Sequence, residues 1–414
     1  MTTPTAEFIA VGSELLEPWR TDTNGAYLSR RLGERGIPVR FRTMVGDVLD
    51  DLKDVFRIAL ARSELIVATG GLGPTIDDLT REAVAELLGL PLVLDEQLAS
   101  GIEDRFRRHS LPMPPRNVRQ AMVPQGAAVL PNRLGTAPGL WLQHGRATLV
   151  LLPGVPAEMR QMVDDSVLPR LPVQGDRFAY RVIKISGLTE SEVDRRLDEV
   201  ARSADPVAWT ILAAPDQIEI HLRERVRAGE QPSGIERVDR GIVSALGSHV
   251  FARDEETMEE VIGRLLVERG ESLATAESIT GGGIARRITS VSGSSRYFRG
   301  SAVVYTDESK KTLLGVETGT LETHGAVSAE TAVEMARGAR RVFGSTWAIS
   351  ATGYAGPEEG GPGRPAGTVV LGLAGPGIET SRALRLPGER ETVRARTGRT
   401  ALELLRGALL GVEM

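Results

Sequence analysis

The chain has 414 residues and a formal net charge of −5, with 25% charged and 41% hydrophobic residues. This length predicts about two to three domains, and the mildly acidic balance argues against a general nucleic-acid binder. Cysteine is absent, which excludes disulfides, thiolate nucleophiles and thiolate metal sites. No apolar run reaches the roughly 18 residues of a membrane span, and the start lacks a secretory pattern. The expected location is therefore the cytoplasm.

Residues 7–170 alternate short apolar runs that end in glycine with helical stretches. The apolar runs are AEFIAVG, VRFRTMVG, ELIVATGG and TLVLLPG. One helical stretch, DDLKDVFRIALARS, places Leu52, Val55, Phe56 and Ala59 at helical spacing. Strands with this apolar character that alternate with helices are typical of a parallel α/β sheet.

A different pattern covers residues 175–252. Two alternating strands, RVIKISG and QIEIHLRERV, accompany two amphipathic helices, which predicts a small α+β module. The stretch LPRLPVQGD precedes the module and is the expected linker.

A second α/β unit is expected from residue 254. Its first helix has an apolar stripe formed by Met258, Val261, Ile262, Leu265 and Leu266. Ser328 is the expected N-cap of a later helix. The apolar face of that helix is formed by Ala332, Met335, Ala336, Ala339, Val342 and Phe343. Residues 357–367 are too rich in Gly and Pro to pack and predict a loop.

The predicted fold class is therefore α/β. Two three-layer α/β domains with mostly parallel sheets, residues 1–170 and 254–414, are joined by the small α+β module at 175–252.

The first candidate site is GGLGPTIDDLT, residues 70–80, which follows a strand and precedes a helix. Glycines in this place leave backbone N–H groups free to face an anion. The stretch is neither a Walker A loop nor G-x-G-x-x-G, because Ile76 occupies the third glycine position. Adjacent carboxylates, Asp77 and Asp78, suggest a divalent ion or recognition of ribose or pterin hydroxyls. The alternative is a tight turn in which Asp78 caps the helix.

The second candidate site is TAESITGG, residues 275–282, where Ser278 could be a helix cap, a phosphate ligand or a nucleophile. A serine nucleophile needs a base. Cysteine is absent, and of the five histidines only His324 lies near the candidate site. A buried lysine can lose its proton, and VVYTDESKK supplies Lys310 shortly after Tyr305.

The glycines after Ser278 can offer N–H groups to an oxyanion, and ATGYAGP, residues 351–357, suits a phosphate or ribose. The alternative keeps this region purely structural. In it, Ser278 or Thr280 caps a helix, and the lysines at 310–311 form a solvated pair.

The first site resembles a known signature. GGLGPTIDDLT is similar to the molybdopterin-binding (MoaB/MogA-like) domain, and VGSELL, TDTN, GTAPG and LLPGVPAEM resemble its version in the CinA competence/damage-inducible family. The resemblance implies a metal-dependent ADP-ribose pyrophosphatase that yields AMP and ribose 5-phosphate. Its implied divalent-metal ligands are Asp77, Asp78, Glu14 and Asp22. Its implied phosphate cradle is Gly70, Gly71 and Gly73, and Thr75 is a further implied substrate-binding residue.

TDTN departs from the family's N-T-N because Asp22 adds a carboxylate. The middle segment GLTESEVDRRL is similar to the family's KH-type module. It lacks the G-x-x-G nucleic-acid clamp, so a spacer or dimer element is expected.

The C-terminal motifs AESITGG, VVYTDESKKTLLGV, GAVSAETA and TGYAGP resemble the CinA C-terminal domain. That resemblance implies a nicotinamide mononucleotide deamidase of pyridine-nucleotide recycling, which makes nicotinate mononucleotide and ammonia without a cofactor. It implies Ser278 as nucleophile, Lys310 as base and Tyr305 as an orienting or donating group. The implied substrate-binding residues are Thr280, Gly281, Gly282, Thr352, Gly353 and Gly356.

Two positions depart from the pattern of that domain. Ile279 stands where relatives often have Cys, a thiol that the chemistry does not need. Asp307 stands where relatives often have Asn, which changes the charge beside Lys310.

The leading hypothesis is a bifunctional pyridine-nucleotide enzyme that forms a homodimer. Its expected partners are small-molecule nucleotides, nicotinamide mononucleotide and ADP-ribose, with neither a membrane nor a nucleic acid. The alternatives are a competence or recombination protein that binds a protein partner, and a molybdopterin-binding module.

Overall fold

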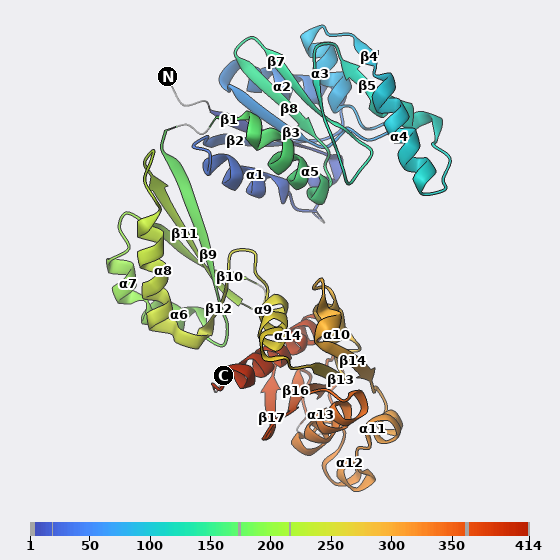
Figure 1. Cartoon of the computed structure of the whole chain (residues 1–414), viewed down its shortest axis with the longest axis vertical. Helices are drawn as coiled ribbons and strands as arrows, with labels where there is room; N and C mark the ends of the chain where they lie inside the picture. The colour runs from blue at the N-terminus through green and yellow to red at the C-terminus, as the bar shows by residue number, and fades with distance from the viewer. Residues whose placement is uncertain (1–4, 19, 173–174, 215–216, 361–363, 413–414) are drawn as a thin grey trace. The chain divides into compact units, whose positions relative to one another are not determined.

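The computed structural model describes residues 5–412 except 19, 173–174, 215–216 and 361–363 (Figure 1). The chain divides into two compact units, Met1–Tyr180 with Arg223–Ile235, and Arg181–Leu222 with Glu236–Met414. Within the described ranges, no helix is both long enough and apolar enough to cross a membrane.

The N-terminal domain is built on a six-stranded sheet in the order β2-β1-β3-β8-β7-β6. The first four strands are parallel, and β7 and β6 add an antiparallel edge. The strands are β1 Ala6–Val11, β2 Val39–Val45, β3 Leu65–Thr69, β6 Ala128–Leu130, β7 Gly139–His144 and β8 Ala147–Leu152. A separate two-stranded antiparallel sheet consists of β4 Leu92–Leu94 and β5 Met122–Pro124. The helices are α1 Asn24–Gly33, α2 Leu49–Arg62, α3 Thr80–Leu88, α4 Glu96–Arg108 and α5 Pro156–Met162.

Alternate residues of β1 point to two separate cores. Ile9 packs with α2 and α3, while Phe8 packs with α1 and α5. This arrangement makes three layers, as the sequence predicted. In α2, Leu52, Phe56 and Ala59 are buried as expected.

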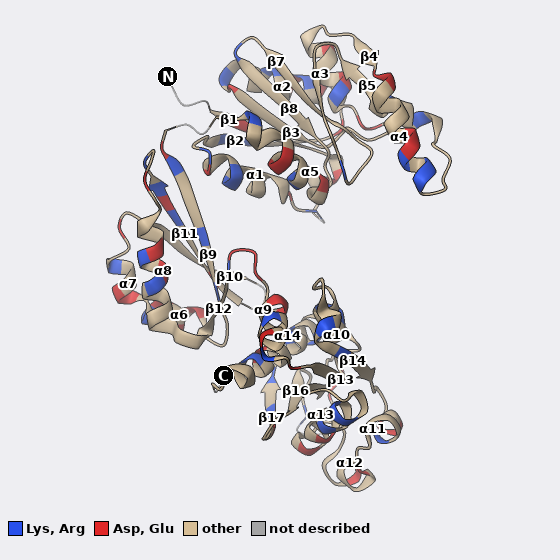
Figure 2. Cartoon of the chain, in the orientation of Figure 1, with Lys and Arg blue, Asp and Glu red and all other residues tan. Residues whose placement is uncertain are grey.

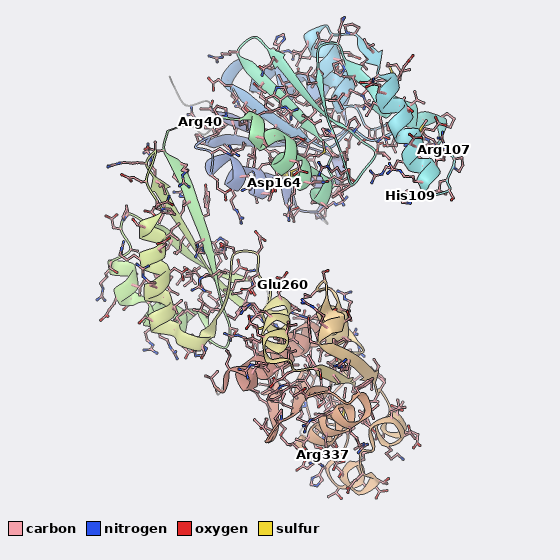
Figure 3. All side chains as sticks on the ribbon, in the orientation of Figure 1. Arg40, Arg107, His109, Asp164, Glu260 and Arg337 are labelled. Carbon is pink, nitrogen blue, oxygen red and sulfur yellow. The ribbon has the colours of Figure 1, made fainter. Side chains whose placement is uncertain are left out.

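A polar cluster ties α1 to the segment that follows α5, where Asp164 lies (Figure 3). The carboxylate accepts from the Tyr27 hydroxyl (2.6 Å) and from Arg31 Nε (2.9 Å). Burial, with the Asp164 hydrogen bond, raises the pKa of Tyr27 to about 12, so the hydroxyl stays a donor at physiological pH.

The middle module has a four-stranded sheet in the order β10-β11-β9-β12. Its elements are β9 Arg177–Ile185, α6 Glu190–Arg196, α7 Asp198–Arg202, β10 Ala208–Ala214, β11 Gln217–Val226, α8 Ser233–Leu246 and β12 Val250–Arg253. Helix α8 of this module, like helix α4 of the N-terminal domain, carries both acidic and basic side chains (Figure 2). The predicted linker lies partly outside the described residues, which omit 173–174.

The C-terminal domain has a five-stranded sheet in the order β14-β13-β15-β16-β17. β13 is parallel to β14 and β15, while β16 and β17 are antiparallel. The strands are β13 Leu273–Glu277, β14 Phe298–Val303, β15 Trp347–Gly353, β16 Thr368–Gly375 and β17 Ile378–Arg385. The helices are α9 Met258–Arg269, α10 Gly283–Thr289, α11 Asp307–Leu314, α12 Thr318–His324, α13 Ala329–Phe343 and α14 Arg390–Leu410.

Helices cover both faces of this sheet. One core joins it to α9, α10 and α14, and the other joins it to α11 and α13. Ser328 caps α13 by accepting from the Thr331 N–H, as predicted. Val342 was expected on the buried face but is 52% exposed, whereas Phe343, in the same last turn, packs against the core. The α/β fold class is confirmed.

Candidate functional sites

The first cavity, of about 660 Å³, lies at the carboxyl ends of the parallel strands of the N-terminal domain. Ligands of open α/β sheets bind at this edge. Eight predicted residues line it together, namely Gly70, Gly71, Gly73, Thr75, Asp77, Asp78, Glu14 and Asp22. Sequence motifs that are far apart in the chain therefore meet in one place.

Two glycines shape the loop between β3 and α3. Gly70 and Gly71 have φ values of +107° and +64°, in the region that side chains rarely adopt. A Cβ at Gly70 would lie 2.1 Å from the Val11 carbonyl oxygen, and one at Gly71 would lie 2.1 Å from Thr80 Oγ1. The Thr80 hydroxyl donates to the Gly70 carbonyl (2.8 Å) and ties the loop to α3.

Asp78 closes the loop and does not cap the helix. Its carboxylate accepts from the Thr75 N–H (2.7 Å) and also from the Thr75 hydroxyl. Helix α3 begins at Thr80 with Leu79 in the cap position and no side-chain cap. The alternative in which Asp78 caps α3 is therefore wrong, because Thr75 competes locally for the carboxylate.

Asp77 is the exposed carboxylate of the loop. A hydrogen bond from Thr75 lowers the pKa of Asp77, and Arg119 adds to the effect. Arg119, which the motif analysis missed, also donates to the carbonyls of Thr75 (2.5 Å) and Asp78 (3.1 Å). This arginine holds the loop from a distant 3-10 helix, Pro115–Ala121.

The other two predicted metal ligands have protein partners. Asp22 accepts from two N–H groups at the start of α1 (2.9 and 3.1 Å) and pairs with Arg42 (2.8 Å). Glu14 lies 3.5 Å from Arg20. Across the described residues, no three His, Asp or Glu side chains come close enough to hold an ion. The carboxylates thus do not form a closed cage, and a divalent ion fits only with substrate oxygens completing its shell, as Mg²⁺ commonly binds.

Asn24, from the TDTN motif, was not predicted as a site residue. Its Nδ2 donates to the Gly154 carbonyl (2.9 Å). Its Oδ1 is buried and has no hydrogen-bond partner among the described atoms, and the residue lines the cavity. A buried acceptor of this kind is suited to a ligand hydroxyl or amine. The sequence did offer a sign of this role, because Asn24 belongs to the same TDTN motif as the predicted ligand Asp22.

The second cavity, also of about 660 Å³, lies at the carboxyl ends of β13, β14 and β15. Six predicted residues line it, namely Ser278, Lys310, Tyr305, Thr352, Gly353 and Gly356. The predicted residues Thr280, Gly281 and Gly282 follow Ser278 in the same loop but do not line the cavity. His324 is also outside the cavity and lies 3.7 Å from Glu330.

Ser278 is buried but does not cap a helix. α10 begins at Gly283, with Gly282 in the left-handed region (φ +93°) at the cap position and no side-chain cap. The alternative in which Ser278 or Thr280 caps the helix is therefore wrong. The carboxylate of Glu277 takes that place, accepting from the first N–H groups of α10 at 2.9 and 2.8 Å.

Lys310 is 2% exposed, whereas its neighbour Lys311 is partly exposed. The alternative of a solvated lysine pair is therefore wrong for Lys310. Its Nζ donates to Asp307 (3.4 Å) from within the same helix. Among the described hydrogen bonds, none joins it to Ser278. Both residues nevertheless line the same cavity.

An arginine that the sequence reasoning missed completes the cavity. Arg390, at the start of α14, donates to the Tyr305 hydroxyl (3.0 Å) and to the Gly356 carbonyl (2.9 Å). It joins the loops that follow β14 and β15, and it lines the cavity. The Thr352 hydroxyl donates to the Ala326 carbonyl (2.7 Å). No motif pointed to residues after 385.

The structure defines a protein with two α/β domains, each of which has a glycine-rich cavity at the carboxyl ends of its parallel strands. Three family models match successive parts of the chain: the probable molybdopterin binding domain at 7–173, the damage-inducible protein CinA KH domain at 180–252, and the CinA C-terminal domain at 255–409. The chain belongs to the CinA family.

Similar proteins cover nearly the whole chain. A relative from Symbiobacterium thermophilum, named as a competence-damage inducible protein, is 43% identical over 98% of this chain and 99% of its own. A CinA-like protein from Solibacter usitatus is 40% identical over 98% of each. A crystal structure of competence damage-inducible protein A from Klebsiella pneumoniae covers 38% of this chain and 100% of its own, at 35% identity and a TM-score of 0.37.

Proposed function

We propose that the C-terminal domain hydrolyses the carboxamide of nicotinamide mononucleotide to nicotinate mononucleotide and ammonia. The observation that carries the proposal is the meeting of Ser278 with the buried Lys310 in one cavity. A serine needs a partner that accepts its proton, and the Lys310 amine is a basic group in the same cavity.

In this mechanism the Ser278 oxygen attacks the carboxamide carbon while neutral Lys310 accepts the serine proton. The tetrahedral intermediate collapses, the C–N bond breaks, and Lys310 returns the proton to the leaving ammonia. Water then cleaves the resulting ester with the same lysine as base, which releases the carboxylate and restores Ser278. Tyr305 orients the substrate or donates a hydrogen bond to it.

Backbone N–H groups after Ser278 are the proposed oxyanion donors. The Gly281 N–H is already used inside the loop, donating to the Ser278 carbonyl (3.2 Å). Ile279 lines the cavity, whereas Thr280 and Gly282 do not, so the Ile279 N–H is the leading candidate. Arg390 supplies positive charge for the substrate phosphate, because a guanidinium suits phosphate oxygens.

The test is ammonia release from nicotinamide mononucleotide, with free nicotinamide as the control substrate. The full chain is expected to release ammonia from the nucleotide alone. Ser278→Ala is expected to abolish release while the circular dichroism spectrum and melting temperature stay unchanged. Release by that variant at the wild-type rate would refute Ser278 as nucleophile.

A second activity is proposed for the N-terminal domain, the hydrolysis of ADP-ribose to AMP and ribose 5-phosphate. What supports it is the left-handed glycine loop with Asp77 at the mouth of one cavity. A bound divalent ion would neutralise charge on the pyrophosphate oxygens. The chain's part is to present N–H groups of residues 71–73 to the phosphate, since the Gly70 N–H donates to the Leu152 carbonyl (2.9 Å). Asp77, Asp78, Glu14 and Asp22 are the candidate oxygen ligands. AMP release that needs added Mg²⁺ or Mn²⁺ and stops with EDTA is the expected result.

The alternatives remain open to simple tests. Pterin fluorescence in the purified protein would favour a molybdopterin-binding module. Stoichiometric capture of a recombinase, without ammonia release, would favour a competence partner. The cytoplasmic location and the homodimer stay predictions, and sedimentation of the full chain checks the latter.

A further inference from the structure

Glu277 is a fully buried carboxylate, 0% exposed, at the end of β13 and directly before the proposed nucleophile. It accepts from the N–H groups of Ile284 (2.9 Å) and Ala285 (2.8 Å) and from the hydroxyls of Thr275 and Ser301 (both 3.2 Å). Four neutral donors and the positive end of α10 offset the loss of hydration that a buried carboxylate suffers.

The same residue anchors both ends of the loop that carries Ser278. The Glu277 backbone is fixed in the sheet, opposite Val303 of β14 and Ala351 of β15. Its side chain reaches across residues 278–283 to bind the first turn of α10. The Glu277 side chain therefore links the two ends of the loop directly.

Arg394 binds the same loop through its backbone carbonyl groups. Its Nε donates to the Ile279 carbonyl (3.2 Å) and its Nη2 to the Thr280 carbonyl (3.0 Å). The C=O and N–H of a trans peptide point in opposite directions, so binding these carbonyls turns the following N–H groups away from the arginine. Gly281, at φ +59°, leaves room for this contact, since a Cβ there would lie 3.1 Å from Arg394 Nη2.

We propose that Glu277 and Arg394 are positioning residues that hold the Ser278 loop in its attacking geometry, Glu277 through the α10 N–H groups and Arg394 through the loop carbonyls. This inference rests on the proposed deamidase function. Neither residue lines the cavity, so both act through the loop and not on the substrate.

The test is Glu277→Gln, which keeps the size of the side chain but sets an amide donor against a backbone N–H. The matched control is Glu224→Gln in the middle module. Glu224 is also a buried carboxylate, and it accepts from two N–H groups at the start of α8 (3.1 and 2.8 Å). Both variants are expected to lower the melting temperature to a similar extent. Only Glu277→Gln is expected to lower kcat, by about 100-fold, with KM within about threefold of wild type.

A second pair of variants keeps the test valid if Glu277→Gln does not fold. Arg394→Gln is expected to lower kcat without changing KM, and Arg394→Lys to restore part of it. The control Arg396→Gln removes an arginine of the same helix that donates to the Pro387 carbonyl (2.6 Å), and it is expected to keep wild-type kcat. Unchanged kcat in Glu277→Gln and Arg394→Gln, or equal losses in the two control variants, would overturn the proposal.

Hydrogen exchange separates this inference from the deamidase function. In Glu277→Gln and Arg394→Gln, the amides of residues 278–286 are expected to exchange faster than in wild type, with other segments unchanged. If the wild-type chain releases no ammonia, the deamidase proposal fails while faster exchange still supports the anchoring of the loop. Unchanged exchange in both variants would refute the anchoring itself.

Discussion

Replacing Lys310 by methionine separates its catalytic role from its structural one. Methionine has a similar length and is apolar, so it fills the same buried space without an amine. If Lys310 accepts the Ser278 proton, Lys310→Met removes the base and leaves the walls of the cavity in place. The variant should therefore fold normally and lose ammonia release.

The magnitudes follow from the surroundings of the lysine. Its ion pair with Asp307 spans 3.4 Å, and the Asp307 side chain is 60% exposed, so water screens the pair to ~1 kcal/mol or less. Replacing a buried charge by an apolar side chain of similar volume is close to neutral for stability. Loss of a general base costs about 10²–10⁴ in rate, or about 3–5.5 kcal/mol in the activation barrier.

The assay is steady-state ammonia release from nicotinamide mononucleotide alongside thermal unfolding. Lys311→Met is the matched control, because Lys311 pairs with Glu308 (2.7 Å) in the same helix and at the same spacing. It should keep wild-type kcat. Lys310→Met with more than about a tenth of wild-type kcat, or equal losses in both variants, would refute Lys310 as the base.

Three further predictions use the same assays. Asp77→Ala should remove metal-dependent AMP release from ADP-ribose and leave ammonia release unchanged; loss of both activities would contradict two independent sites. Gly281→Ala should lower the melting temperature and kcat, because φ +59° is strained for alanine and the Cβ meets Arg394; wild-type values for both would contradict this. Asp307→Asn keeps the size of the side chain and removes a largely exposed partner of Lys310, so the melting temperature should stay close to that of wild type; a large drop would contradict this.

Local patterns were sufficient to place the loops of both cavities. Each strand that ends in glycine before a helix predicted a βα junction, and the structure confirms those junctions after β3 and β13. The Ser328 cap was also readable, because a serine before an apolar helical stripe has few other roles. These features depend on residues within a few positions of one another.

The missed residues act over long sequence distances. Arg394 contacts a loop 115 residues earlier, and Arg390 contacts Tyr305 from 85 residues away. Periodicity shows that a helix has an apolar face but not which loop its first turn meets. Glu277 did leave a signal, since a charged residue at the end of the buried strand LATAE needs partners. For Asp78 the local sequence was ambiguous, because a carboxylate just before a helix can either cap the helix or close the preceding turn.

Helix α14 makes long-range hydrogen bonds at both of its ends. Its first turns bring Arg390 to the cavity and Arg394 to the Ser278 loop. Near its other end, Arg406 donates to the carbonyls of Ser248 (2.9 Å) and Val250 (3.0 Å). Phe251 of the adjoining strand β12 is buried in the same core as the helix. A chain cut at the predicted boundary near residue 253 would lose that aromatic side chain and leave the arginine without these acceptors. Strand β12 therefore belongs to the sheet of the middle module and also contributes to the core of the C-terminal domain.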